Sequence, residues 1–198
     1  MGHAGDTRPI CLIRPPAVET FRFSSLSITP PLGLAYVAGS LVHAGHDVRV
    51  IDAVTGAPRQ HTRYFRGYLV GLRAEQIVAR IPADAALIGI TVVFTHEWPA
   101  IVRLVDLIKD RFPDVPVIGH VHGSELLMLE RIAAGPPSSW SHAEAWAERM
   151  RSWAGRCAAL VANSERGLER ASELLGVPRE RFHLIPNGFG PEFRPFEL

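Results

Sequence analysis

The chain has 198 residues, a formal net charge of +1, and a composition that is 47% hydrophobic and 21% charged. This length allows one domain or at most one and a half, and the composition is that of an ordinary globular protein. The low charge and the lack of a long basic run argue against nucleic acid as a partner. The sequence has neither an apolar stretch of membrane-spanning length nor a signal-peptide pattern, so we expect no membrane span and a cytoplasmic location.

Short apolar runs that are rich in β-branched residues alternate with segments of helical periodicity. This alternation is typical of a parallel sheet covered by helices. The predicted strands are residues 10–14, 47–52, 87–93, 116–121, 158–163 and 182–186. Between the first two, apolar residues recur at helical spacing from Leu34 to Val42, and Gly45 follows where a left-handed helix cap is favoured.

The later helices carry start and stop signals. Pro99 suits the first turn of a helix that ends before Pro113. Ser141 has capping-box spacing to the glutamate three residues later. Ser164 is placed to cap the last clear helix, which Gly176 would end.

Together these elements predict an α/β fold: a single Rossmann-like, doubly wound, mainly parallel sheet of about six strands with helices on both faces. We expect segments 15–31, 54–73 and 134–140 to be irregular. Ligands bind such sheets beyond the carboxyl ends of the strands. Any site is therefore expected in the loops at 15–33, 53–56, 94–98, 119–125 and 164–166.

Several kinds of site are not supported by the sequence. The first strand is followed by RPPAVE instead of the glycine-rich dinucleotide fingerprint, so Asp52 is predicted to be a helix-facing or turn carboxylate. A zinc-protease motif starting at His96 would need a second histidine where Ala100 stands, and we predict no metal site. Cys11 and Cys157 are predicted to be buried, reduced thiols.

Residues 10–118 resemble the N-terminal cobalamin-binding domain of radical SAM proteins, on the phrases at 29–39, 45–53 and 87–99. The resemblance implies a corrin over the carboxyl edge of the sheet. Its predicted contacts are Pro31, Leu32, Gly33, Thr91, Thr95 and Gly119. From the residues alone, a Pro-Pro-Leu-Gly run that simply enters a helix explains 30–33 equally well.

This chain lacks the three-cysteine motif that radical SAM enzymes need for an iron–sulfur cluster. We therefore expect no iron–sulfur cluster here, and radical chemistry would need a separate radical SAM domain. The D-x-H-x-x-G pattern, whose histidine ligates cobalt in some cobalamin proteins, is also absent.

Residues 119–198 resemble the later half of the N-terminal domain of retaining, two-domain, family 4-like glycosyltransferases. The phrases at 120–129, 141–156, 160–164 and 185–195 carry this likeness. It implies that the interdomain cleft is lined by His122, Gly123, Ser124, Glu125, Ser164, Asn187 and Gly188. The alternative for this turn is structural, with Ser124 capping a helix and His122 bonding a carbonyl. Gly190 stands where the family has an aspartate.

The sequence thus predicts a fusion of a cobalamin-binding-like portion, 1–118, with a glycosyltransferase-like portion, 119–198, which together complete one α/β domain. The first functional hypothesis is a cobalamin-binding module without its radical SAM catalytic domain. The alternative is a truncated glycosyltransferase that has the acceptor-binding domain but not the nucleotide-sugar domain. A second alternative is a folded fusion with no activity. Under the first two hypotheses, activity would require the partner domain.

Overall fold

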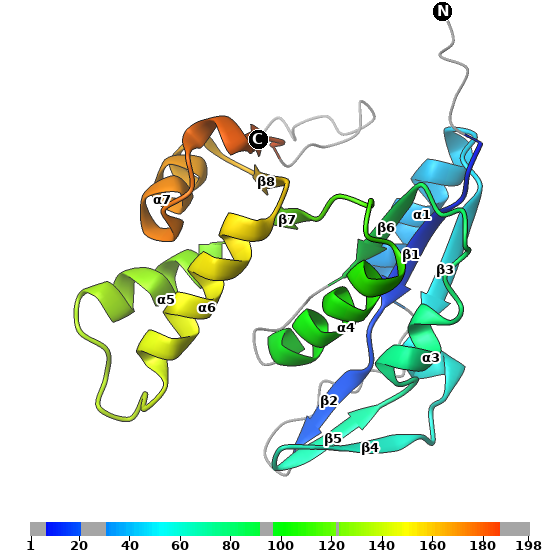
Figure 1. Ribbon diagram of the computed structural model, residues 1–198, viewed down its shortest axis with the longest axis horizontal. Helices are drawn as coiled ribbons and strands as arrows, with labels where there is room; N and C mark the ends of the chain where they lie inside the picture. The colour runs from blue at the N-terminus through cyan, green and yellow to red at the C-terminus, as the bar shows by residue number, and fades with distance from the viewer. Residues whose placement is uncertain (1–6, 21–30, 92–96, 122, 187–198) are drawn as a thin grey trace, which may run out of the picture. The chain divides into compact units, whose positions relative to one another are not determined.

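A computed structural model describes residues 7–20, 31–91, 97–121 and 123–186 (Figure 1). The chain divides into two compact units, Met1–Val115 and Pro116–Leu198, and each has its own parallel sheet and core. The division falls close to the predicted junction at residue 118. The assignment of the two portions to different families stays a prediction at this stage.

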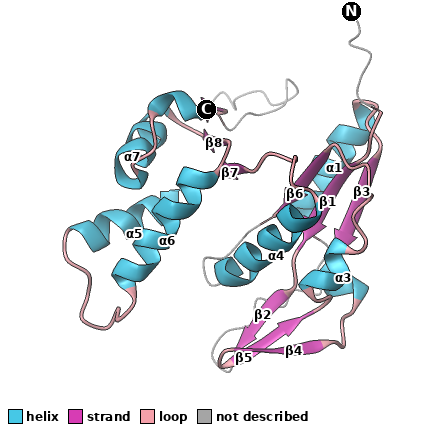
Figure 2. Ribbon diagram, in the orientation of Figure 1, coloured by secondary structure: helices cyan, strands magenta, loops and turns pink. Residues whose placement is uncertain are grey.

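The first unit is built on three parallel strands in the order β3-β1-β6 (Figure 2). They are β1 (Ile10–Arg14), β3 (Val48–Asp52) and β6 (Leu87–Ile90). Three helices accompany this sheet: α1 (Leu32–His43), α3 (Ala74–Val78) and α4 (Trp98–Arg111). Figure 1 shows α3 and α4 in front of the sheet and α1 behind it.

Alternate residues of the central strand β1 fill the core of this unit. Cys11 and Ile13 have no exposed surface, and they pack in one cluster with Leu104 and Ile108 of α4 and Ile77 of α3. The side chain of Leu12 lies on the opposite face of the sheet and is only 4% exposed. Burial on both faces is what a central parallel strand requires.

A second, antiparallel sheet follows directly from the first. It consists of β2 (Ala17–Thr20), β5 (Gly67–Val70) and β4 (His61–Tyr64), in that order. The expectation that 15–31 and 54–73 are irregular was therefore wrong for these strands. The strand β4 (HTRY) carries polar residues and alternates only between exposed and half-buried positions, so it lacks the apolar alternation by which strands are recognised.

The second unit has the parallel strands β7 (Ile118–His120), β8 (Ala159–Ala162) and β9 (Phe182–Leu184), in that order. Its helices are α5 (Gly123–Ala133), α6 (Ala143–Arg156) and α7 (Glu165–Leu175), and a short 3-10 helix covers Arg179–Arg181. The helices α5, α6 and α7 contact one another. The central strand is again the most buried, with Leu160 fully enclosed.

Most of the predicted helix ends are confirmed. Pro99 lies in the first turn of α4, and Gly45 has the expected positive φ of 90° after α1. Ser164 caps α7, and Gly176 ends that helix in the left-handed conformation. The capping box at Ser141 was wrong, because α6 begins at Ala143 and its N-cap is His142, which makes no side-chain cap bond.

The α/β class with mainly parallel strands is confirmed, and all six predicted strands are present: the first has the predicted bounds, and the other five are shorter within the described residues. The sheets are smaller than expected. The described strands are hydrogen-bonded in two parallel sheets of three strands and one antiparallel sheet of three strands. A further short helix, α2 (Ala53–Gly56), follows β3.

The packing around Gly119 gives a stability test. A Cβ atom at Gly119 would lie 2.6 Å from Cη2 of Trp153 and 2.7 Å from Cδ2 of Leu160. We therefore expect Gly119→Ala to lower the free energy of unfolding by about 1–3 kcal/mol in urea denaturation, because the core would be overpacked.

The matched control for Gly119 is Gly155 in α6, where an added Cβ meets nothing within 4 Å. Gly155→Ala should leave stability unchanged or raise it by up to about 1 kcal/mol, because alanine is the better helix former. Similar losses in both variants would show that the contact with Trp153 is not the cause.

Candidate functional site

The carboxyl ends of β1 and β3 meet at an ion pair. Arg14 and Asp52 are partners in the strand register, and Nη1 of Arg14 lies 3.3 Å from Oδ2 of Asp52, with both side chains less than 15% exposed. The other oxygen, Oδ1, accepts hydrogen bonds from the backbone N–H groups of Val54 at 3.0 Å and Thr55 at 3.3 Å. The predicted turn role of Asp52 is confirmed, since this carboxylate caps α2.

The residues predicted to contact a corrin fall in both units. Pro31, Leu32 and Gly33 form the start of α1, where Leu32 is 65% exposed and a Cβ at Gly33 would meet nothing within 4 Å. Thr91 follows β6, and its backbone N–H donates to the carbonyl of Ile13 at 3.0 Å. Thr95 lies outside the described residues.

Gly119 belongs to the second unit and lies in the middle of β7. Its neighbours Trp153 and Leu160 occupy the space that a side chain would need. Close packing is thus a sufficient reason for glycine here. A role of Gly119 in binding a cofactor stays a prediction without a structural observation behind it.

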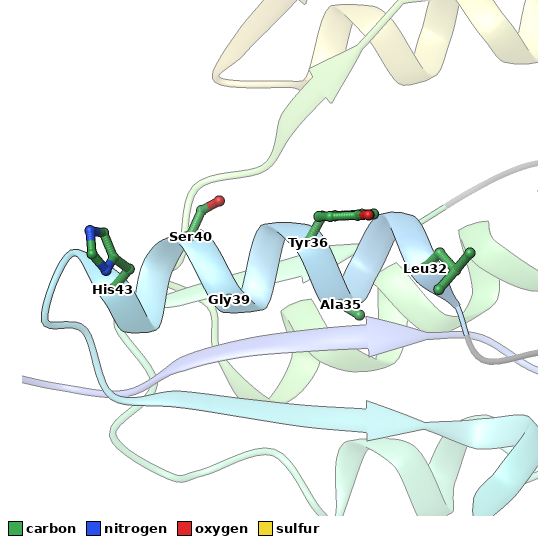
Figure 3. Close-up of a pocket in the computed structure, with 6 residues that line it drawn as sticks. All are labelled: Leu32, Ala35, Tyr36, Gly39, Ser40 and His43. Atoms are coloured by element: carbon green, nitrogen blue, oxygen red, sulfur yellow. The ribbon is translucent and has the colours of Figure 1, made fainter. Parts of the chain in front are cut away.

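The outer side of α1 carries an open depression of about 520 Å³ (Figure 3). Its lining consists of Leu32, Ala35, Tyr36, Gly39, Ser40 and His43. All six residues come from one helix, and Tyr36 is 77% exposed. The polar groups here are two hydroxyls and one imidazole, which are enough to bind a ligand at a surface but do not enclose one.

The second unit gathers polar side chains at the carboxyl ends of β7 and β8. These strands are parallel neighbours, so the helices that follow them, α5 and α7, begin at the same edge of the sheet. The start of α5 carries Gly123, Ser124 and Glu125, and the hydroxyl of Ser124 donates to Oε2 of Glu125 at 3.0 Å. The alternative prediction, that Ser124 caps the helix, would instead have its hydroxyl bond to the backbone.

At the start of α7, Oγ of Ser164 accepts a hydrogen bond from the backbone N–H of Gly167 at 3.1 Å. A Cβ at Gly167 would lie 2.9 Å from that oxygen, so glycine at this position keeps the cap accessible. Glu165 forms an ion pair with Arg179 at 3.1 Å. The remaining predicted site residues, His122, Asn187 and Gly188, lie outside the described residues.

One polar residue at this edge was missed by the sequence analysis. Asn163 follows β8, and its Oδ1 lies 3.8 Å from the position of a Cβ at Gly167. The signal was available, because Asn163 lies inside the phrase at 160–164 that carries the glycosyltransferase resemblance. The edge thus combines hydroxyl, amide and carboxylate groups with the backbone N–H groups of two helix starts, and such groups can hydrogen-bond a polyhydroxylated ligand.

The two cysteines are free and buried, as predicted. Burial raises the pKa of both thiols to about 11, although Arg181 and Arg156 lower that of Cys157 in part. Within the described ranges, no three histidine, cysteine or acidic side chains are grouped so as to hold a metal ion. In the same residues, no helix has both the length and the apolar character to cross a bilayer.

Comparison with known proteins gives one family. The profile of the family described as Glycosyltransferase Family 4 matches residues 33–193. This match covers most of the chain and runs through the predicted junction at residue 118, so one family accounts for both portions. It gives no support to a cobalamin-binding or radical SAM portion. A search of curated proteins finds no match.

The cap of α7 can be tested separately from any binding role of Ser164. Ser164→Ala removes the acceptor for the N–H of Gly167 and should lower the free energy of unfolding by about 1 kcal/mol in urea denaturation. Ser164→Asp keeps a cap acceptor and should stay close to the wild type. Equal losses in both variants would contradict a capping role.

The buried thiols predict a pH dependence of stability. The pKa of each thiol is 9.0 in the unfolded chain and about 11 in the folded protein. The folded state therefore holds more protons between these pH values, and the free energy of unfolding should fall as the pH rises through this range. The comparison is with Cys11→Ala/Cys157→Ala, in which the fall should be shallower because the two thiols are absent. An unchanged slope would contradict the assignment.

Proposed function

The chain belongs to Glycosyltransferase Family 4, and we propose that it is the acceptor-binding, N-terminal half of a retaining, two-domain glycosyltransferase. The observation that carries the proposal is the family match across both compact units. The polar edge at the carboxyl ends of β7 and β8 supports it, because ligands of open α/β sheets bind at such edges.

In this proposal, the sugar acceptor lies against the starts of α5 and α7. Glu125 is half exposed and its carboxylate can accept hydrogen bonds from sugar hydroxyls. Ser124 is exposed beside it and can donate or accept. Gly123 lets the backbone approach the ligand, and the first N–H groups of both helices offer further donors. The resemblance extends this role to His122, Asn187 and Gly188.

The other substrate would be a nucleotide sugar held by a second Rossmann-like domain, as the resemblance implies. The reaction would break the bond between the glycosyl group and the nucleoside diphosphate and form a bond from the glycosyl carbon to the acceptor oxygen, with release of the nucleoside diphosphate and of the hydroxyl proton and with the anomeric configuration retained. The contribution of the present chain would be to bind and orient the acceptor. No general base or nucleophile is assigned to it.

Cobalamin binding stays a separate prediction that rests on the resemblance of residues 10–118. Leu32 and Gly33 at the start of α1 are exposed, and the depression that Leu32 helps to line is open to solvent. Spectroscopic titration with hydroxocobalamin, followed by gel filtration, tests it directly. Co-elution of the red chromophore that is lost in Gly33→Val would support a cobalamin module and would count against the glycosyltransferase proposal.

The acceptor site is tested by nuclear magnetic resonance titration of the ¹⁵N-labelled chain with methyl α-glucoside, methyl α-mannoside and methyl β-galactoside. We expect saturable shifts at residues 123–125 and 163–165 for at least one glycoside. Glu125→Gln should weaken the binding of that glycoside by about tenfold, because a hydrogen bond to a charged carboxylate is replaced by a weaker one to a neutral amide oxygen.

The control for this titration is Glu144→Gln. Glu144 also lies in the first turn of a helix, but this helix, α6, follows α5 and not β7 or β8, so its substitution should leave glycoside binding unchanged. Shifts confined to residues outside 123–125 and 163–165, or equal weakening by both variants, would contradict the proposed site.

A further inference from the structure

The antiparallel sheet of the first unit extends from the carboxyl end of the parallel sheet. Its strand β2 starts at Ala17, only two prolines after β1 ends at Arg14. Figure 1 shows the hairpin of β4 and β5 beyond the ends of β1 and β3, with the turn between the two strands at its tip. Neither the family resemblance nor the proposed acceptor site uses this hairpin.

The segment that contains the hairpin is basic, although the chain as a whole is nearly neutral. Between Asp52 and Glu75 the sequence has four arginines and no acidic residue. Three of them, Arg59, Arg63 and Arg66, lie in or beside the hairpin and are exposed. The only acidic residue in the three strands is Glu19, whose Oε2 lies 3.8 Å from Nε2 of His61.

The tip of the hairpin presents an aromatic ring to solvent. Phe65 is 77% exposed and has a φ of 48°, a left-handed conformation that bulky residues rarely adopt. Among the aromatic rings of the described residues, its ring contacts that of Tyr64 in a T-shaped arrangement, with a centroid distance of 4.8 Å. A polar residue or glycine would satisfy this turn with less strain.

We propose that the tip of this hairpin docks on the surface of an anionic lipid bilayer. Phe65 would enter the boundary between head groups and acyl chains, while Arg63 and Arg66 bind lipid phosphates. Phe65 and Arg66 are the two turn residues and Arg63 lies two positions before the turn, so an apolar ring and two cations share one end of the hairpin, as binding to a membrane interface requires. Arginine also binds phosphate through two parallel hydrogen bonds.

A single-stranded nucleic acid fits the hairpin less well. Such a partner needs a row of open aromatic faces on which bases stack. Here the guanidinium of Arg63 lies over the ring of Tyr68, 5.8 Å from its centroid, and the side chain of Tyr64 is half buried. Of the phenylalanine and tyrosine rings in the hairpin, that of Phe65 is the most exposed.

The proposal is tested by co-sedimentation of the full chain with two kinds of vesicle, phosphatidylcholine alone and phosphatidylcholine with 30% phosphatidylglycerol (about one lipid in three, as a typical anionic surface). The wild type should sediment with the anionic vesicles only, and less so at high salt. Arg63→Ala and Arg66→Ala should each weaken the partitioning by about fivefold. Phe65→Asn should weaken it on the order of tenfold without loss of folding, because asparagine tolerates a positive φ.

Two control substitutions in the second unit distinguish specific binding by the hairpin tip from non-specific adsorption to vesicles. Leu127 in α5 is 61% exposed, and Arg149 in α6 is exposed, so Leu127→Asn and Arg149→Ala change the same chemistry elsewhere. Both should sediment like the wild type. Equal weakening by Leu127→Asn and Phe65→Asn, or no sedimentation of the wild type with anionic vesicles, would overturn the proposal. Salt-sensitive binding of labelled oligouridine without vesicle binding would overturn it in favour of nucleic acid.

Discussion

Each unit of this protein depends on one central parallel strand, which is buried on both faces in the first unit and buried on one face and half-buried on the other in the second. In the first unit it is β1, and in the second it is β8; both run between two parallel partners. Parallel neighbours cannot be joined by a tight turn, so each connection must cross back through a helix. All loops that follow the strands therefore return to one edge of the sheet, and this constraint gathers the polar residues of the two edges.

At these edges, the structure separates residues that serve the fold from residues that remain open to a ligand. Asp52 is held by Arg14 and by two backbone N–H groups of α2. Ser164 is engaged in the cap of α7. By contrast, Ser124 and Glu125 bond each other at the surface and hold no other element in place through that bond. The start of α5 is thus a stronger candidate for acceptor contact than the start of α7.

The sequence was informative where burial dictates residue type, and it failed where burial does not. All six parallel strands were predicted, because a buried strand must be a short run of apolar, β-branched residues. The hairpin of β4 and β5 was missed, because β4 (HTRY) has no buried residue and carries polar side chains, and β5 (GYLV) is only four residues long. The α1 helix was placed correctly, but almost all its residues are apolar, so spacing could not show that Tyr36 and Val42 face solvent. Which edge residues bind a ligand was not decided by residue type, since capping and binding use the same hydroxyls and carboxylates.

The same physics explains why the first half of the chain resembled a different family. The phrase at 45–53 contains a glycine with positive φ after a helix, followed by alternating apolar residues of a parallel strand. Any helix-to-strand connection in a doubly wound sheet needs this pattern, because the glycine ends the helix and the next residues must enter the core. Such a phrase therefore identifies the fold and not the ligand. A family profile discriminates better because it spans successive connections, and here it passes through both units and their junction.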